Sequence, residues 1–314
     1  MRPSEYHNSY MQQFNFGLEQ EFAGNTIRLF YVGALGRHLS RTFPDINAPP
    51  PNTAVNPDAL RPFHSTVPNV TSIVFIDTEA SSSYNALQAS FARAYRIGLS
   101  TQFNYTWAHG LNNRADSGFG TVPALSSRLD YGNSGIDVRH RLAASVFYEL
   151  PFGKHASGTK GVLTKAWQLN LAGVWSMGLP FTVLNAADLS NTNPGASAAD
   201  RPNQIAKATL ANPGVGRFFN TDAFVAQAPG TLGNERSNQL YGPHNRRLDA
   251  SLFKNFSVGR EANLQFRAEC FNVTNTSNFA APAAILGGAN FGQLTQMTAG
   301  YAPREIQFAL RLQF

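Results

Sequence analysis

The chain has 314 residues and a net charge of +6; 43% of the residues are hydrophobic and only 14% are charged. Its single cysteine, Cys270, excludes an internal disulfide and a cysteine-based zinc site, and no apolar run is long enough for a transmembrane helix. The 25 Lys and Arg residues are scattered singly, which argues against nucleic-acid binding. A chain with 24 Phe, 26 Gly and 18 Pro suits many strands joined by polar loops.

Stretches in which apolar and polar residues alternate predict strands along the whole chain. The clearest is 99–109, where apolar Phe103 and Trp107 alternate with polar Gln102 and Asn104. This period of two predicts strands at 14–18, 27–31, 84–95, 99–109, 137–150, 166–177, 247–256, 263–270 and 304–314. Most of them span roughly 10 to 14 residues, longer than the usual soluble strand and suited to a tilted strand that crosses a bilayer.

The connections between these strands alternate in length. The expected connections are short at 21–24, 96–98 and 258–260, moderate at 151–165, and long at 35–83, 110–136, 178–246 and 274–303. Outer-membrane β-barrels have short periplasmic turns and long external loops in this order. A soluble β-sandwich is the alternative, but it has no reason to collect its long loops at one end and usually carries more Lys and Glu on its solvent face.

Aromatic residues near the strand ends resemble the two interfacial girdles of a membrane barrel. The expected girdle residues are Tyr105 and Trp107 at one rim and Tyr95, Tyr148, Trp167 and Phe256 at the other. Ordinary packing in a protein core is the alternative. Two cations, Arg93 and Lys254, interrupt the apolar face near strand ends, where we expect their side chains to extend to the headgroups.

If the apolar face meets lipid, the polar face lines the lumen. The lumen-facing candidates are Gln102, Asn104, Arg139, Arg141, Gln265, Arg267, Glu269 and Arg311. Two interpretations stay open: these side chains pair with one another or with a plug for structural reasons, or they form a mostly cationic wall along a solute path.

The last residues of the chain have the pattern of a closing barrel strand recognised during outer-membrane insertion. A terminal aromatic residue follows apolar residues at every second position, namely Phe308, Leu310, Leu312 and Phe314. We therefore expect these four residues to be an assembly signal.

Catalytic motifs are not found in the sequence. The seven histidines have no HExxH arrangement, and there is no GxSxG, no P-loop lysine and no GxGxxG between a strand and a helix. We expect no catalytic residue, no metal site and no cofactor. Ligand contacts are instead expected in loops 110–136 and 178–246, where residues such as Phe218 and Phe219 could hold a polar ligand by hydrogen bonds and stacking.

Several runs together resemble the C-terminal barrel of Oar-like TonB-dependent transporters, which are abundant in acidobacteria. The runs are YNALQASFARAYRIGLSTQFNYTWAHGLNN, DVRHRLAASVFYELPFGK, AWQLNLAGVWSMGLPFTV, GRFFNTDAFVAQAPGTLGN, LDASLFKNFSVGREANLQFRAECFNVTNTSNF and REIQFALRLQF. The resemblance implies an all-β antiparallel transmembrane barrel of about 22 strands with long extracellular loops and an N-terminal plug. It also implies a TonB box that couples uptake to the proton gradient.

Compared with that family, residues 1–314 are expected to supply only the C-terminal part of the barrel, about nine or ten strands, without a plug, a TonB box or a signal peptide. We expect a fragment of an outer-membrane transporter of a Gram-negative bacterium, with its C-terminus in the periplasm. The expected partners are outer-membrane lipid, the barrel assembly machinery and an unidentified substrate of the oligosaccharide or metal-chelate class, with TonB acting only through the missing N-terminal region. The alternative is a surface barrel or adhesin-like envelope protein that transports nothing.

Overall fold

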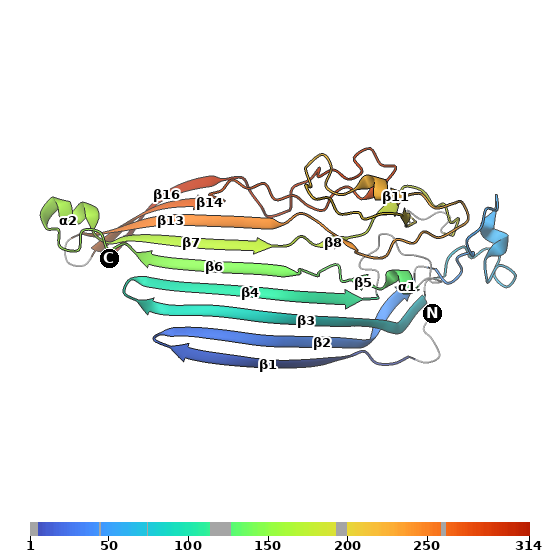
Figure 1. Cartoon of the computed structure of the whole chain (residues 1–314), viewed down its shortest axis with the longest axis horizontal. Helices are drawn as coiled ribbons and strands as arrows, with labels where there is room; N and C mark the ends of the chain where they lie inside the picture. Colours follow the sequence, from blue (N-terminus) through green and yellow to red (C-terminus); the bar gives the residue numbers. More distant parts are fainter. Residues whose placement is uncertain (1–5, 44, 74, 114–126, 193–199, 259–261) are drawn as a thin grey trace.

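The computed structural model describes residues 6–43, 45–73, 75–113, 127–192, 200–258 and 262–314. Within these residues, nine long strands form one continuous antiparallel sheet in the order β1-β2-β3-β4-β6-β7-β13-β14-β16 (Figure 1). Their bounds are β1 Tyr10–Phe22, β2 Asn25–Phe43, β3 Phe75–Arg96, β4 Leu99–Asn112, β6 His140–Glu149, β7 Trp167–Ser176, β13 Asn245–Val258, β14 Ala262–Phe271 and β16 Glu305–Gln313. Every strand therefore pairs with the next long strand along the chain.

The connections lie at opposite ends of the sheet according to their length (Figure 1). The end that carries the hairpin turns and the C-terminus is called the turn end below, and the opposite end, which carries the long connections, is called the loop end. Two hairpins at the turn end use two-residue turns, Ala23–Gly24 and Ile97–Gly98, whose four residues all have positive φ. Such turns match the right-handed twist of the strands they join.

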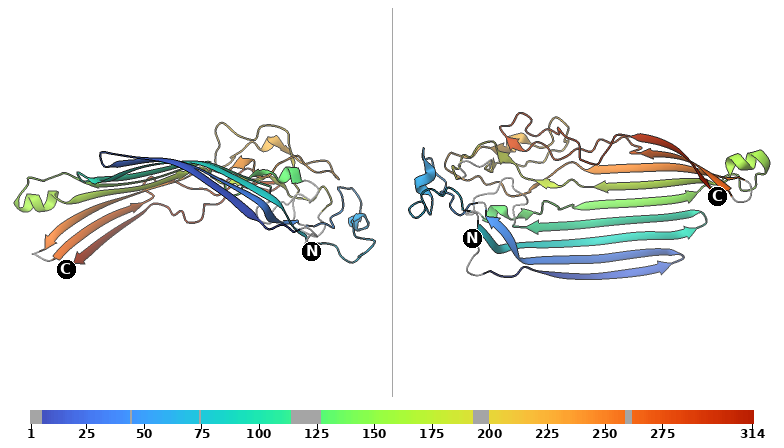
Figure 2. Two further views of the ribbon diagram at one scale, coloured as in Figure 1. Left: turned by 90° about the horizontal axis from the view of Figure 1, so that it is seen from below. Right: turned by 180° about the vertical axis from the view of Figure 1, so that it is seen from behind.

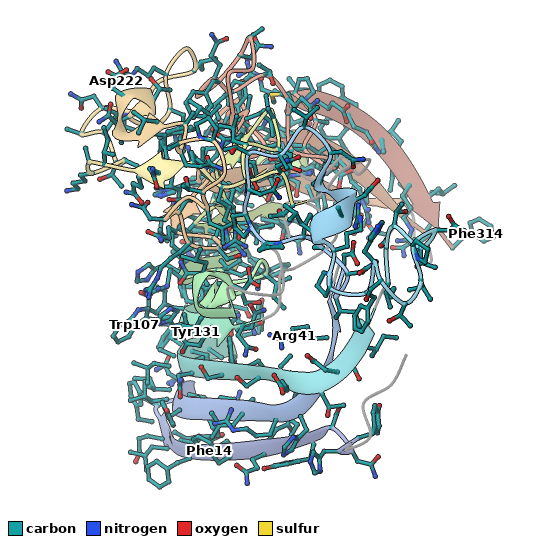
Figure 3. All side chains as sticks on the ribbon, turned by 90° about the vertical axis from the view of Figure 1, so that its right-hand side faces the viewer. Phe14, Arg41, Trp107, Tyr131, Asp222 and Phe314 are labelled. Atoms are coloured by element: carbon teal, nitrogen blue, oxygen red, sulfur yellow. The ribbon has the colours of Figure 1, made fainter. Side chains whose placement is uncertain are left out.

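The sheet is curved, and its two faces differ in chemistry. Figure 2 shows β13, β14 and β16 bending away from the plane of β1 to β4. In Figure 3 Arg41 points into the hollow of the curve, whereas Phe14, Trp107 and Phe314 point away from it. The convex face is thus the apolar one, and its side chains have no protein cover: Leu310 is 70% exposed. No second sheet covers this face among the described residues, so the β-sandwich alternative is wrong.

Cross-strand pairs of glycine and an aromatic residue fill both faces of the β1–β2 hairpin. Gly33 lies opposite Phe14, and a Cβ at Gly33 would lie 2.2 Å from the Phe14 ring. On the other face, a Cβ at Gly17 would lie 2.2 Å from the ring of Phe30, its register partner. Each ring lies over its partner glycine, where the side chain of any other residue would clash with it. These two pairs therefore fix the register of the edge hairpin.

The first long connection is shorter than the sequence predicted. β2 has 19 residues and ends at Phe43, and β3 has 22 residues and begins at Phe75, so both strands extend into the connection predicted at 35–83. The pairing continues past two register shifts between Gly36 and Arg41. An ion pair between Arg41 and Asp77, at 2.9 Å, connects the two extended strands on the concave side. The alternation of apolar and polar residues ends earlier than the ladder does.

The connections contain short elements of their own. Those at the loop end are η1 Pro57–Leu60, α1 Ser127–Asp130, β5 Gly132–Asn133, β8 Pro180–Phe181, β9 Leu184–Asn185, β10 Asn203–Gln204, η3 Thr221–Ala223, β11 Phe224–Val225, β12 Leu240–Tyr241 and β15 Ile285–Leu286; at the turn end lies α2 Gly158–Thr164. The pair β9–β15 is parallel and joins the two connections that precede β13 and β16. These connections are therefore folded together.

A hydrophobic cluster, called the loop-end core below, holds these connections. It consists of Phe181, Val183, Ala208, Phe219, Ala223, Phe224 and Leu240, with Phe218, Ala284, Leu286 and Phe291 packed against it. Phe219 is 3% exposed and makes edge-on ring contacts with Phe224 at 5.8 Å and Phe291 at 5.2 Å. The expectation that Phe219 stacks on a ligand is wrong, because its ring is inside this core.

The sheet does not close into a barrel. In the described part of the chain, β1 and β16 are its two edge strands and each pairs with one neighbour. The nine strands make one curved wall, and a barrel of about 22 strands stays a prediction. No helix among the described residues is long and apolar enough to cross a membrane.

Candidate functional site

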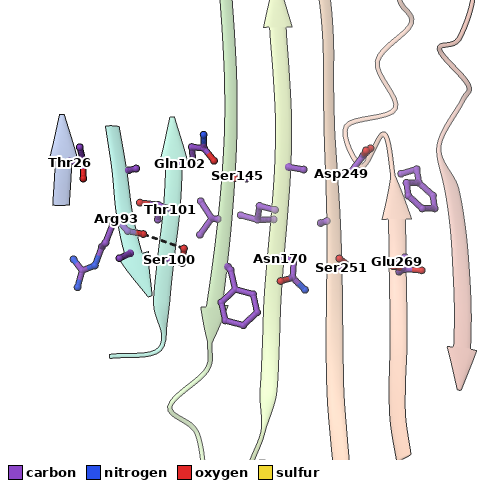
Figure 4. Close-up of a pocket in the computed structure, with 18 residues that line it drawn as sticks. Thr26, Arg93, Ser100, Thr101, Gln102, Ser145, Asn170, Asp249, Ser251 and Glu269 are labelled. Atoms are coloured by element: carbon purple, nitrogen blue, oxygen red, sulfur yellow. Dashed lines mark hydrogen bonds between the residues drawn. The ribbon is translucent and has the colours of Figure 1, made fainter. Parts of the chain in front are cut away.

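Small side chains line the middle of the concave face. Reading across the sheet in register, Ala92 lies opposite Gln102, Gln102 opposite Ser145, Ser145 opposite Ala172, and Ala172 opposite Asp249. This row borders a hollow of about 520 Å³, in which polar groups come from seven strands, β2, β3, β4, β6, β7, β13 and β14 (Figure 4). Because most of these side chains are short, the wall is open at its centre.

A second hollow, of about 540 Å³, adjoins the first on the side of the loop end. Gln102, Ser145 and Asp249 line both hollows. The polar lining of the second hollow further includes Asn104, Arg141, Arg247 and Tyr301. Ala143 and Gly173 form its floor. A polar recess with two guanidinium groups thus lies on a small-residue floor.

One of the two guanidinium groups is held in a fixed position. Arg247 Nε donates to both carboxylate oxygens of Asp249, at 2.8 and 2.9 Å. Asp249 Oδ1 also accepts the backbone N–H of Asn272 at 2.8 Å, and the guanidinium lies 5.8 Å from the centre of the Phe271 ring. Charge-assisted hydrogen bonds of this kind orient a cation without removing all of its donors.

The other guanidinium group, that of Arg141, is exposed and has no hydrogen bond or ion pair with any described residue. Arg141 lies opposite Thr106 on β4 and Ser176 on β7. A free guanidinium beside amide and hydroxyl groups can bind a carboxylate, a phosphate or the hydroxyl groups of a sugar. The recess is therefore suited to a hydrophilic solute, with a preference for an anionic one.

The lumen-facing candidates from the sequence occupy three different places. Gln102, Asn104, Arg141 and Glu269 line one or both hollows. Nearer the turn end, Arg267 Nε donates to Gln265 Oε1 at 2.6 Å, Gln265 Nε2 donates to Asn255 Oδ1 at 2.9 Å, and Arg311 lies exposed opposite Gln265. Arg139 precedes β6 and belongs to a cluster at the loop end.

That cluster joins the start of β6 to β12. Arg139 Nε donates to Asp137 Oδ2 and to the Tyr241 hydroxyl, both at 3.0 Å, and the Tyr241 hydroxyl donates to Asp137 Oδ2 at 2.5 Å. Burial and the Asp137 carboxylate raise the pKa of Tyr241. Because every group in this cluster has a hydrogen-bond partner, Arg139 has a structural role here. The cluster precedes β6, which begins at His140 and not at Asp137 as predicted.

Two residues that the sequence alone did not select are Arg247 and Asp249. Both belong to the polar set of β13, and they occupy positions i and i+2, which share one face of a strand. This spacing could have identified both residues as facing the lumen. Tyr301 is different, because the β14–β16 connection brings it to the recess and no local pattern marks it.

A buried charged group lies beneath the loop end, apart from the recess. Arg201 donates to Asp130 Oδ1 at 2.6 Å and to the Leu129 carbonyl at 2.5 Å. Glu235 is fully buried nearby, and neither of its carboxylate oxygens has a hydrogen-bond partner in the described structure. Burial raises the pKa of Glu235 to about 7 in spite of the Arg201 guanidinium. This carboxyl group can thus change its charge near neutral pH.

The loop-end rim of the convex face has ring contacts at the predicted positions. The Tyr105 hydroxyl lies 2.7 Å from His140 Nδ1, and the rings of Trp107 and His140 stack with a centroid distance of 6.5 Å. Trp107 remains 53% exposed, and its place in an interfacial girdle stays a prediction.

At the turn end the aromatic residues enclose a lysine. Lys254 Nζ lies 4.7 Å from the Phe256 ring and 5.8 Å from the Trp167 ring, and it donates to the Lys165 carbonyl. Lys254 is 2% exposed, so its side chain does not extend to headgroups as the sequence suggested. Tyr148 lies beside Trp167 on the same face, opposite Leu169.

Tyr95 is an exception to the predicted girdle. Its hydroxyl donates to Glu149 Oε2 at 2.6 Å and its ring meets the edge of Phe147 at 5.9 Å. Phe147 and Glu149 belong to the concave face, so Tyr95 lies on the opposite face from the one predicted. The cause is a register shift between Arg93 and Arg96, which inserts an extra residue and reverses the alternation.

The residues of the closing strand lie together on the convex face. Ile306, Phe308, Leu310 and Leu312 are all more than half exposed, and Phe308 stacks on Phe266 of β14 at 6.2 Å. Their role as an assembly signal stays a prediction. Among the described residues, no group of three His, Cys, Asp or Glu side chains is arranged to hold a metal ion.

Comparison with known proteins gives a family and distant structural likenesses, two of which are described here. No curated protein matches the chain. The outer membrane transporter YddB from Escherichia coli has 11% identity and a TM-score of 0.49, over 99% of this chain and 33% of its own. The FrpB iron transporter from Neisseria meningitidis (F3-3 variant) has 9% identity and a TM-score of 0.41, over 97% of this chain and 31% of its own.

The present chain spans about a third of the length of each of these structures. The model of the outer membrane beta barrel domain matches residues 1–307. This match covers nearly the whole chain and agrees with the curved antiparallel sheet and its exposed apolar face. The chain therefore belongs to the outer membrane beta barrel domain family and is a protein of the outer membrane.

Proposed function

We propose that the chain is the C-terminal wall of a TonB-dependent outer-membrane transporter that binds and imports a hydrophilic solute. In this proposal the C-terminus and the turn end lie in the periplasm, and the folded loop end lies outside the cell. TonB would act through a plug encoded outside residues 1–314. The solute would be an oligosaccharide or a metal chelate, and the chain would bind and translocate it without chemical conversion.

One observation carries this proposal: the concave face has an open polar recess, although the convex face is apolar. The recess contains the free Arg141 guanidinium, the oriented Arg247 guanidinium and the amide of Asn104. A wall that served only to pack a barrel interior would be expected to pair its cations fully. A path for solutes needs hydrogen-bond donors that are not paired within the wall and can bind the passing solute.

Uptake by cells that carry the complete gene as their only copy tests the proposal. Maltohexaose with a fluorescent label and ferric citrate represent the two solute classes. We expect one of them to accumulate, and accumulation to stop when a protonophore removes the proton gradient. Arg141→Ala combined with Arg247→Ala should lower uptake, whereas Arg217→Ala on the loop-end surface should not. Equal accumulation with and without the gene would contradict transport of these classes.

Orientation is tested separately with cysteines introduced in a Cys270→Ser background. Val215 at the loop end is 53% exposed, and Thr159 of α2 is exposed at the turn end. A membrane-impermeant maleimide should label Val215→Cys on intact cells and Thr159→Cys only after lysis. The reverse pattern would overturn the proposed orientation.

A surface barrel without transport is the second candidate, and the loop-end core favours it. Folded connections with their own core can present a fixed binding surface, as an adhesin needs. The same uptake experiment separates the two candidates, because an adhesin would leave the accumulation of both probes unchanged by the protonophore.

A further inference from the structure

The segment 151–165, between β6 and β7, folds into a compact unit called the turn-end knob below. Ala156 N donates to the Gly153 carbonyl at 2.8 Å, and Lys165 N donates to the Gly161 carbonyl at 3.1 Å. Gly153 has φ +65, and a Cβ there would lie 2.0 Å from Thr164 Oγ1. These close approaches fix the connection, which includes α2, in one shape.

Two hydrogen bonds attach the knob to the apolar face of the sheet. The indole N–H of Trp167 donates to the Leu163 carbonyl at 2.9 Å, and Lys254 Nζ donates to the Lys165 carbonyl. Trp167 and Lys254 lie opposite each other in register on the convex face. The knob therefore continues the surface that the strands present to lipid, beyond the ends of the strands.

The knob holds large apolar side chains away from the protein. Phe152 is 61% exposed, Val162 57% and Leu163 60%, and Ile97 in the neighbouring turn is 79% exposed. The hydrogen bonds described above fix the backbone of the knob, so the chain cannot turn Val162 and Leu163 inward by a small adjustment. A patch of this kind on a folded element marks a surface that another phase or partner covers.

The charged side chains of the knob itself have one sign. Lys154, Lys160 and Lys165 are exposed, and the segment 151–165 contains no Asp or Glu. The nearest acidic residue along the chain, Glu149, accepts a hydrogen bond from the Tyr95 hydroxyl and lines a hollow at the turn end with Phe152, Lys154 and Lys165. An apolar patch bordered by lysines matches a layer of anionic headgroups above acyl chains.

We propose that the turn-end knob is an interfacial anchor that inserts Val162 and Leu163 among anionic phospholipids of the leaflet at the turn end. Lys154, Lys160 and Lys165 bind the phosphate groups of the same leaflet. The proposal rests on the membrane location of the sheet and does not depend on transport. The anchor fixes the depth of β6 and β7, because the knob is continuous with both strands.

A fluorescent probe on the full chain tests this proposal in vesicles of equal parts phosphatidylcholine and phosphatidylglycerol. The probe is bimane on Val162→Cys in the Cys270→Ser background. Matched probes are placed at Phe308→Cys on the lipid face of β16 and at Val215→Cys at the loop end. Acyl-brominated lipids quench a probe within the bilayer, and iodide quenches a probe in water.

We expect brominated lipids to quench the probes at positions 162 and 308, and iodide to quench the probe at 215. The triple variant Lys154→Gln, Lys160→Gln, Lys165→Gln should weaken insertion of the knob roughly a hundredfold, at about fivefold per lysine, so that iodide then quenches position 162. Lys207→Gln, a single exposed lysine at the loop end, should change nothing. Lipid quenching at 308 in the triple variant shows that its sheet is still inserted.

Iodide quenching of the probe at 162 equal to that at 215, with lipid quenching intact at 308, would overturn the anchor and leave the barrel unaffected. Lipid quenching at 162 that the triple variant does not change would overturn the role of the lysines and of anionic lipid. If position 308 also fails to report lipid, the anchor and the insertion of the sheet are both wrong.

Discussion

The long sheet and the loop-end core use phenylalanine in opposite ways. On β16, Phe308 is 69% exposed, whereas Phe219 in the loop-end core is 3% exposed. Both side chains leave water when the protein reaches its final environment, but the sheet needs a lipid phase to do so and the core needs only the rest of the chain. The same residue type therefore serves two different solvents within one molecule.

This difference separates two kinds of stability. The sheet is held by strand pairing and by its transfer into the membrane, so charges on its convex face should block assembly. The loop-end core is held by ring packing among connections, so cavities should loosen it locally without preventing assembly. The predictions below test that separation.

The largest effect is expected on the convex face of the closing strand. Leu310→Asp together with Leu312→Asp should prevent membrane assembly, because both put a charge on the lipid face. Such a charge costs about 2 to 4 kcal/mol for Lys or Arg near the bilayer midplane, and less for Asp and toward the edge of the bilayer. Removal of Phe314 should act in the same direction. The measurement is the amount of the gene product in the outer membrane, and Gln313→Asp, on the other face of β16, is the control. Normal levels of the double variant would contradict the assignment of faces.

A cavity in the loop-end core should have the next largest effect. Phe219→Ala removes a buried ring and should destabilise the core by about 3 to 5 kcal/mol, while assembly of the sheet continues. Amide hydrogen exchange of residues 178–246 in the membrane-inserted protein measures this. Val215→Ala, exposed in the same connection, should leave exchange unchanged. Loss of assembly in Phe219→Ala would show that the two regions fold as one unit.

The buried carboxyl group of Glu235, next to the backbone of Val183 in the loop-end core, provides a pH test of this region. Glu235 has a pKa of about 7 against 4.5 for the free side chain, so the folded state favours the protonated form. The stability that this adds is full at low pH and declines as pH rises from 4.5 to about 7, by a total of about 3 kcal/mol. Exchange in the loop-end core should thus be slower at about pH 5 than at about pH 8, after correction for the intrinsic rate.

Two variants check that pH dependence. Glu235→Gln should abolish it and protect the core at the higher pH, because the neutral amide needs no ionisation. Asp222→Asn, on the surface of the same connection, should retain it. A pH dependence that survives in Glu235→Gln would assign the effect to another group.

The smallest effect is expected at Lys254, a cation enclosed by aromatic rings on the convex face. Lys254→Met loses a hydrogen bond to the Lys165 carbonyl and should change stability by about 1 kcal/mol. Leu252→Lys, two residues farther from the turn, has no such carbonyl partner and should cost about 2 to 4 kcal/mol toward the midplane. Urea unfolding from vesicles measures both. Equal costs would show that local hydrogen bonding does not protect Lys254.

Local pattern was sufficient to predict much of the sheet. Each of the nine predicted strands overlaps a long strand of the sheet, and the tight turn at Ile97–Gly98 lies where expected. The pattern failed at Tyr95, where a bulge reverses the faces, and beyond Gly36, where the ladder continues without alternation. Bulges and irregular strand ends depend on the neighbouring strand, which a single segment does not contain.

The candidate site could be predicted only in part for the same reason. Gln102, Asn104 and Arg141 follow from the face of their strands, and Arg247 with Asp249 could have been selected from their spacing. Tyr301 could not, because a long connection decides where it lies. The sequence predicts a ligand contact at Phe219 because a loop phenylalanine and a core phenylalanine have the same local sequence environment.

By itself, the sequence determined which side of each regular strand is apolar, because side chains alternate along an extended chain whatever surrounds it. It also determined the order of short and long connections, which is a property of spacing. Only the tertiary structure decided that the long connections fold together around the loop-end core and that residues 151–165 form a knob. Those features result from contacts between segments far apart in the chain, and no local period records them.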